Sequence, residues 1–271
     1  RGRPTDPAYF PNGLPGPDMA EGNQPVVTGT SATGSNRDKQ YYLTGNLSMT
    51  ITIPGLEGFD ISGLFSYNKE FQQKKLWQTP WTLYSFDKAS YINNGMQDPE
   101  QFLHAYSAGP TDPSLTQTFY QQEKTMENVV ANYNRSFGLH DFGLMAGVEL
   151  QQFGYNTFNA YRRGFVSTSI SELFAGSQAN WSNGGSSADG SRLSYFGRLD
   201  YAFDHKYLFQ FVGRYDGSYL FPEDQRFGFF PAVSAGWRIS QESFFRDHVN
   251  FANDLKLRAS WGRTGNDIIN A

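Results

Sequence analysis

Apolar and polar residues alternate along the stretch from Leu43 to Ile53. Odd-numbered positions hold Leu, Gly, Met or Ile, and even-numbered positions hold Thr, Asn or Ser. A period of two indicates a β-strand, because successive side chains of a strand point to opposite faces. A turn at 54–58 is followed by a second alternating stretch. Residues 41–70 are therefore predicted to form a β-hairpin.

The same unit recurs three more times along the chain. The further hairpins are predicted at residues 119–156, 192–216 and 228–263, which gives eight strands in four hairpins. Residues 1–40 are rich in Pro, Gly, Asn, Asp, Ser and Thr and show no periodicity. They are predicted to form one long extracellular loop.

The connections between strands alternate in length. Those at 54–58, 138–141 and 204–206 are short, whereas those at about 71–118 and 157–190 are long. Strands with one apolar and one polar face, joined by short turns at one end and long loops at the other, are typical of a transmembrane β-barrel. We therefore predict an all-β fold, an antiparallel transmembrane β-barrel segment of eight strands in four hairpins. Aromatic residues near strand ends fit an interfacial girdle; they are Phe137, Phe142, Tyr201, Phe203, Tyr207 and Phe209.

A soluble β-sandwich also alternates, so a secreted all-β carbohydrate-binding or adhesin module stays open as an alternative. The polar faces carry more Asn, Ser, Thr, Gln, Arg and Asp than a packed core could satisfy, which favours the barrel. Exposure of the apolar face separates the two folds, because a barrel exposes these residues and a sandwich buries them. The deciding residues are Leu43, Leu47, Met49, Ile51, Phe142, Leu144, Leu199 and Phe211.

Eight strands can close a small barrel, but the predicted topology argues against closure. If the short turns face the periplasm, strand 43–53 runs downward from an external loop and strand 254–262 ends outside. Both ends of the chain would lie on the long-loop side, whereas a complete bacterial barrel has both termini in the periplasm. We expect a slice of a larger barrel. The chain has neither an initial Met nor a secretory signal, so it is expected to be a mature form or an internal fragment.

Several segments resemble the SusC/RagA-type TonB-dependent outer-membrane transporters of Bacteroidetes. The longest is LKLRASWGRTGN at 255–266. The other similar segments are KLWQTPW at 75–81, NRSFG at 134–138, YFGRLDY at 195–201, RYDGS at 214–218 and RFGFFPAVSAGWRIS at 226–240. The family's N-terminal plug, TonB box, early strands and final strands have no counterpart in this chain.

The resemblance implies a multi-pass barrel of roughly 22 strands with a plugged lumen, in the bacterial outer membrane and surrounded by its lipid. It implies active import of oligosaccharides and, in some members, peptides. It also implies a SusD-like surface lipoprotein as a partner, with TonB acting through the absent plug region.

The amino-acid composition and net charge exclude several other classes of protein. Aromatic residues make up 17% of the chain and charged residues 18%, which is unlike a disordered segment. The net charge of -4 argues against a nucleic-acid partner. There is no cysteine, which excludes disulfides and thiolate metal sites. No run of about 18 apolar residues occurs, so no transmembrane helix is expected.

The sequence offers no catalytic or metal site, so we predict no enzyme and no cofactor. Neither a nucleophile elbow nor a phosphate-binding glycine loop occurs. The four histidines are scattered, and Asp98 and Glu100 lack the spacing of a calcium loop. Glu123 and Glu127 could be imagined as a glycosidase pair, but they are expected to lie on a solvated strand surface with no pocket between them.

Two groups of residues are candidates for ligand contact. Trp77, Trp81 and Tyr84 lie in a loop stiffened by Pro80, where their rings could stack on the apolar face of a sugar. Alternatively, these rings pack the loop against the barrel rim or the lid partner. Arg214 and Asp216 share the predicted lumen face, where they form either a simple ion pair or a contact to substrate or plug.

Overall fold

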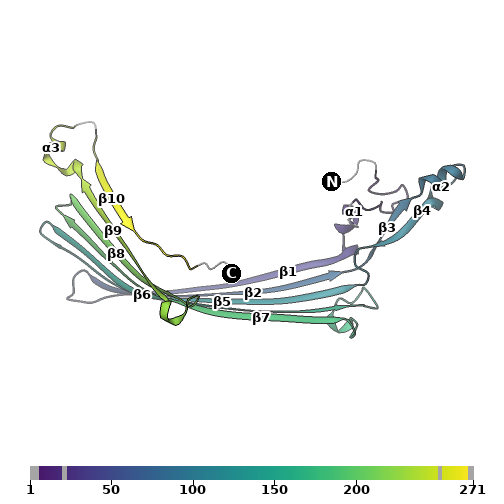
Figure 1. The fold of residues 1–271 in the computed structure, drawn as a ribbon, viewed down its shortest axis with the longest axis horizontal. Helices are drawn as coiled ribbons and strands as arrows, with labels where there is room; N and C mark the ends of the chain where they lie inside the picture. Colours follow the sequence, from purple (N-terminus) through teal and green to yellow (C-terminus); the bar gives the residue numbers. More distant parts are fainter. Residues whose placement is uncertain (1–5, 20–22, 250–251, 268–271) are drawn as a thin grey trace. The chain divides into compact units, whose positions relative to one another are not determined.

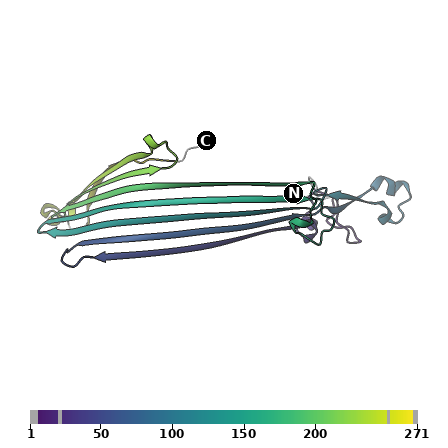
Figure 2. The same cartoon turned by 90° about the horizontal axis from the view of Figure 1, so that it is seen from below.

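The structure, a computed structural model, describes residues 6–19, 23–249 and 252–267. Its main element is an eight-stranded antiparallel sheet, which confirms the predicted fold class. The strands lie side by side in chain order, as Figure 2 shows. They are β1 Gly34–Thr52, β2 Phe59–Gln78, β5 Ser114–Phe137, β6 His140–Arg163, β7 Trp181–Phe203, β8 Tyr207–Ser218, β9 Phe227–Arg238 and β10 Lys256–Gly262.

Several strands extend further toward the long loops than the predicted hairpins. For example, β5 begins at Ser114 and β6 continues to Arg163, whereas the predicted hairpin spans 119–156. In these extensions both faces carry polar residues, so the apolar alternation that marks a strand in the sequence is lost. Backbone pairing between the strands nevertheless continues there.

The chain divides into two compact units. The first contains Arg1–Tyr41, Phe71–Gln121 and Asn156–Ser186, and the second contains Tyr42–Glu70, Gln122–Tyr155 and Ser187–Ala271. The short helices of the first unit are α1 Pro25–Thr28, η1 Ser31–Thr33, α2 Lys88–Asn93, η2 Pro99–Phe102 and η3 Leu173–Ala175. Those of the second are η4 Glu223–Gln225, η5 Ile239–Gln241 and α3 Ser243–Arg246. None of the helices in the described residues has the length and apolarity that a membrane span requires.

In the first unit, the segment 71–118 is not the simple long loop expected from the sequence. It contains a second, two-stranded sheet formed by β3 (Trp81–Phe86) and β4 (Leu103–Ala108), with α2 between the strands (Figure 1). The α2 helix begins after Asp87, whose carboxylate accepts a hydrogen bond from the Ser90 backbone N–H at 3.0 Å. Each strand has only six residues, which is too short for its period to stand out in an aromatic-rich stretch.

Segment 1–40 was likewise expected to be one loop, yet part of it packs against this hairpin. Val27 on α1 is buried with Leu83 and Ala108 of the hairpin. The hydroxyl of Tyr106 accepts a hydrogen bond from the Asp18 backbone N–H at 2.9 Å. Around Asp18 and Val27 the N-terminal segment therefore packs on the β3–β4 hairpin. The expectation of one loop over 1–40 is also wrong at its end, because β1 already begins at Gly34.

In the second unit, the strand register separates a polar face from an apolar face. Asp200, Gln210 and Ser234 are cross-strand neighbours on one face. Leu199, Phe211 and Val233 are neighbours on the other face. Cross-strand neighbours share a face, so the alternation predicted from the sequence is realised across β7, β8 and β9.

The apolar face is open to the surroundings rather than packed as a core. Leu47 is 70% exposed and Leu144 is 47% exposed. Seven of the eight deciding residues are exposed, and Leu199 alone is half-buried. A β-sandwich would bury this face against a second sheet. The exposure is therefore the result expected of a barrel wall.

Aromatic residues cluster beside the short turns of the second unit, as the sequence predicted. The ring centroids of Phe142 and Tyr201 are 5.0 Å apart, and those of Phe203 and Tyr207 are 6.3 Å apart. The turn between Phe203 and Tyr207 places Asp204 and His205 at φ values of 50° and 53°. Two successive residues with positive φ define the type I′ turn that suits a tight hairpin.

Candidate ligand-facing surface

The predicted pair Arg214 and Asp216 lies on the polar face of β8. Arg214 donates two hydrogen bonds to the carboxylate of Asp216, at 3.2 Å from Nε and 3.1 Å from Nη2. Its guanidinium carbon also lies 5.3 Å from the centroid of the Phe196 ring. Both charged side chains are partly exposed, so the pair adds at most about 1 kcal/mol to stability. Its charges and the neighbouring ring are accessible to a ligand.

The pair lines a recess of ≈ 750 Å³. Ligand pockets typically measure about 300–1,000 Å³, so this recess has the size for a small ligand. Asp267, which lies beyond β10, reaches into it. Its carboxylate accepts hydrogen bonds from Arg192 Nε at 2.6 Å and from Ser218 Oγ at 2.9 Å. The Arg192 hydrogen bond, helped by Ser218, lowers the pKa of Asp267 below its ordinary value. This carboxylate therefore stays ionised at neutral pH.

Sequence reasoning missed Arg192 and Asp267 as members of this site. The register pairs Arg192 with Ser218, and alternation along β7 could have placed Arg192 on the polar face. Asp267 lies 75 residues from Arg192 and follows the last strand, so no periodicity indicated it. The remaining charged residues that line the recess are Glu149, Arg226 and Arg263. The recess thus offers both signs of charge to a ligand.

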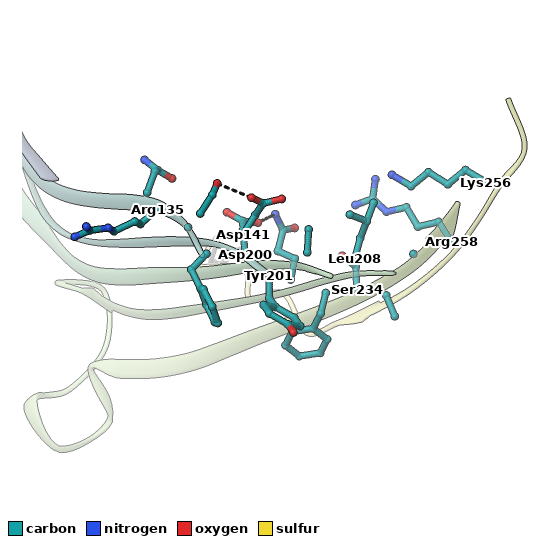
Figure 3. A pocket seen from close by; sticks show the side chains of 17 residues that line it. Arg135, Asp141, Asp200, Tyr201, Leu208, Ser234, Lys256 and Arg258 are labelled. Atoms are coloured by element: carbon teal, nitrogen blue, oxygen red, sulfur yellow. Dashed lines mark hydrogen bonds between the residues drawn. The ribbon is translucent and has the colours of Figure 1, made fainter. Parts of the chain in front are cut away.

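A second recess, of ≈ 600 Å³, lies on the polar face near the short turns. Figure 3 shows Asp141 and Asp200 on one side of the ribbon and Tyr201 on the other. Asp200 accepts a hydrogen bond from Gln210 at 2.7 Å and forms an ion pair with Arg198 at 2.7 Å. Across the recess are Lys256 and Arg258 of β10, neither of which has a carboxylate within 4.0 Å among the described residues.

The three candidate aromatic residues do not form one patch. Trp77 is 7% exposed and packs against Leu115 and Phe165, with a Trp77–Phe165 ring distance of 4.7 Å. Trp81 packs against a different cluster, around Leu83. Tyr84 lies on the opposite face of β3 from Trp81, because three positions separate them along the strand.

Burial favours the packing interpretation for Trp77. Trp81 and Tyr84 are partly exposed, which leaves part of each ring accessible. The buried indole Nε1 of Trp81 has no hydrogen-bond partner within the described part of the chain. Of the three residues, Trp81 and Tyr84 are the better placed to touch a ligand or partner.

Of the two carboxylates considered for catalysis, Glu127 is exposed and Glu123 has ordinary surface partners. Glu123 forms an ion pair with Lys69 and accepts a hydrogen bond from Tyr67 at 3.4 Å. Across residues 6–19, 23–249 and 252–267, no group of three His, Asp or Glu side chains has the geometry to hold a metal ion. His140 lies 2.8 Å from the Tyr201 hydroxyl and belongs to the aromatic cluster beside the turns.

Comparison with known proteins finds relatives among TonB-dependent receptors, although no family model matches the chain. The TonB-dependent receptor SusC of Bacteroides thetaiotaomicron is 38% identical over 148 residues, which is 52% of this chain and 14% of SusC. The TonB-dependent receptor P26 of Formosa agariphila is 49% identical over 76 residues, which is 28% of this chain and 8% of P26. The chain therefore spans only a small part of the length of these relatives.

Solved structures show the same fold. The RagAB peptide transporter matches with a TM-score of 0.67 at 20% identity, over 86% of this chain and 24% of the solved chain. The RagAB peptide importer in its open-open state matches with a TM-score of 0.68 at 21% identity, over 86% of this chain and 23% of the solved chain.

Together, the exposed apolar face, the polar opposite face and these matches define a class, the barrel wall of a TonB-dependent transporter. Within that class, the matches to SusC and to RagAB confirm the resemblance seen in the sequence. The chain is similar in sequence to SusC and in fold to RagAB, as a barrel segment of the SusC/RagA type is expected to be.

Proposed function

We propose that the protein containing this chain imports nutrient ligands, chiefly oligosaccharides, across the bacterial outer membrane. The observation that carries the proposal is the sheet with an exposed apolar face and a polar face of charged recesses. In a closed barrel, the first face meets lipid and the second lines the lumen. Import of nutrients also fits the names of the relatives, which are receptors and transporters rather than enzymes.

The proposal includes two partners. A SusD-like lipoprotein would cover the long-loop side, where the β3–β4 hairpin offers Trp81 and Tyr84. TonB would supply energy through a plug outside this chain. Within the barrel, the Arg214–Asp216 pair and the recess beside it would contact the ligand or the plug.

Two alternatives compete with oligosaccharide import. RagAB is a peptide importer, and the mixed charges around Arg214 suit a peptide with charged termini. A secreted soluble carbohydrate-binding or adhesin module would explain the aromatic residues, but it would have to cover the exposed apolar face.

A growth experiment tests the proposal. The full-length gene is deleted from its host, and the strain is grown on a panel of single glycans and on peptides. We expect a defect on at least one glycan that the wild-type gene restores and a gene lacking the TonB box does not. Restoration by both genes would contradict energisation through TonB. A growth defect on peptides alone would show that the substrates are peptides rather than oligosaccharides. Normal growth on every glycan and peptide would contradict import of either nutrient.

A further inference from the structure

We propose that a recess on the outward face of the first unit binds a phosphate-bearing lipid of the outer leaflet. The proposal rests on the proposed function only through the placement of the barrel in the outer membrane. The recess has a volume of ≈ 340 Å³ and lies over β1, β2, β5 and β6, with Leu173 of η3 at its edge. This volume would admit a phosphate together with part of the headgroup.

The lining of this recess is basic. Arg37, Lys39, Lys74 and Lys75 line it, and none of its lining residues is acidic. Lys75 is paired with Glu172 at 2.7 Å. In the portion of the chain that the structure describes, Arg37 and Lys39 have no carboxylate within 4.0 Å. Lys74 borders the recess, but its even number places it on the face of Gln72. The unpaired Arg37 and Lys39 are suited to a phosphate, with which Arg forms bidentate hydrogen bonds.

Side-chain pairing shows which face of β1 the recess occupies. Asp38 accepts a hydrogen bond from Gln72 at 2.9 Å, and Tyr42 donates one to Glu70 at 3.4 Å, so even-numbered residues of β1 and β2 meet on one face. Arg37 and Lys39 have odd numbers and point to the opposite face. Along β1 this is the face that carries Leu43, Leu47, Met49 and Ile51.

The two cations thus lie at the long-loop end of the apolar stripe of β1. Lys39 precedes Leu43 by four residues, or about 13 Å along a strand. In the proposed orientation, the headgroups of the outer leaflet lie at this level, just above the hydrocarbon. A phosphate attached to a lipid of that leaflet would be at the right level to reach these cations.

An aromatic pair gives the recess an apolar part as well. Phe119 and Phe158 line it with ring centroids 5.9 Å apart, and Phe158 is 54% exposed. A free phosphate would use the cations but not these rings. An amphiphile with an anionic head and apolar chains matches both, because membrane binding combines apolar burial with electrostatic attraction.

The edge of the recess at Leu173 is fixed by contacts with buried side chains. Leu173 packs against the cluster of Trp77, Leu115 and Phe165, and the neighbouring Glu172 is paired with Lys75. The β6–β7 connection therefore gives the recess one packed edge, at Leu173.

The test measures lipid binding by the purified full-length transporter in detergent. The probes are lipid A carrying a phosphate, the same lipid after enzymatic removal of the phosphate, and inorganic phosphate. We expect the wild type to bind the phosphorylated lipid about tenfold or more tightly than either of the other probes, and Arg37→Gln/Lys39→Gln to lose about tenfold in affinity. The control Lys88→Gln/Lys124→Gln removes the same charge away from the recess and should bind as the wild type does. Phe158→Ala should weaken binding of the lipid but not of inorganic phosphate.

Three results would overturn the proposal. They are unchanged binding by Arg37→Gln/Lys39→Gln, equal binding of both lipids by the wild type, and equal losses in the test and control variants. Inorganic phosphate binding as tightly as the lipid would identify a free-anion site and reject the lipid. Heat modifiability on gels verifies that every variant forms a barrel. Because the readout is lipid binding, its failure is distinct from a failed growth test of nutrient import.

Discussion

Leu47 and Ser48 are neighbours in the sequence, yet β1 points them to opposite faces. Leu47 belongs to the exposed apolar stripe, and Ser48 lies on the polar face. The same division appears in β8, where Phe211 and Gln210 differ in the same way. At this scale the direction of the side chain, more than its identity, determines which solvent the residue meets.

Placing a charge at these two positions tests the membrane orientation. Leu47→Arg in the full-length transporter should reduce the free energy of unfolding by about 2–4 kcal/mol if the position lies near the bilayer midplane. Ser48→Arg is the matched control and should cost far less, because its side chain would point to the polar lumen. Urea unfolding of the barrel in lipid bilayers measures both values, and equal costs would rule out this orientation.

Glu242 gives a pH-dependent contribution to stability beside the short turns. Its carboxylate accepts hydrogen bonds from Tyr207 Oη at 2.7 Å and Trp237 Nε1 at 3.0 Å, and these bonds lower its pKa below the ordinary value. A lowered pKa in the folded state stabilises the fold above the unfolded pKa. This stabilisation is lost as the pH falls through the folded pKa.

We therefore expect the wild type to lose more stability than Glu242→Gln between about pH 6 and about pH 3. The comparison with Glu242→Gln removes the contribution of the other carboxylates, which titrate in both proteins. Urea midpoints measured across this range provide the data. Parallel curves for the two proteins would show that the two hydrogen bonds do not depend on ionisation.

Among the elements, the β3–β4 hairpin is the one that the sequence did not indicate. The long strands were predictable because their apolar residues repeat every second position over ten or more residues. Trp81 and Leu83 share one face of β3, but six residues give too few repeats to stand out. Contacts between distant segments, such as that of Arg192 with Asp267, could not be predicted from the periodicity of the sequence. They depend on strand register and on the path of the chain after β10.

The hairpin also supplies a test of the aromatic candidates. Trp81→Ala and Tyr84→Ala should each weaken binding of glycan or lipoprotein by about 1 kcal/mol or more if the rings contact either partner. Trp77→Ala should instead destabilise the rim, by about 3–5 kcal/mol, because the ring is buried.

Isothermal titration of the full-length transporter with each partner measures the affinities, and heat modifiability verifies folding. Unchanged affinity for both partners in folded Trp81→Ala and Tyr84→Ala variants would assign the two rings to packing alone. A stable rim in Trp77→Ala would contradict the importance of its burial.

At the scale of the whole molecule, the sheet has two open edges. Among the residues that the structure describes, β1 is the first strand in the sheet and β10 the last, and each has a sheet neighbour on one side only. Unpaired edges and an exposed apolar face both promote association. Alternation predicted this sheet, and the predicted topology also indicated that it would not close on itself.

Expressed alone in water, the chain should aggregate or require detergent. The physical reason is that neither the apolar face nor the two edges is covered. Size-exclusion chromatography and thermal unfolding with and without detergent provide the measurement. A soluble monomer that melts cooperatively would support the secreted module instead.

The chain order of the strands has a consequence for assembly. Each strand of the main sheet pairs with the sheet strand that precedes or follows it along the chain. Pairing can therefore advance one hairpin at a time, and the edge left by each hairpin serves as a template for the next. Such local pairings keep the loop-closure entropy of each step small and speed folding. A defect in an early hairpin would then stall insertion at that point and leave every later strand without a template.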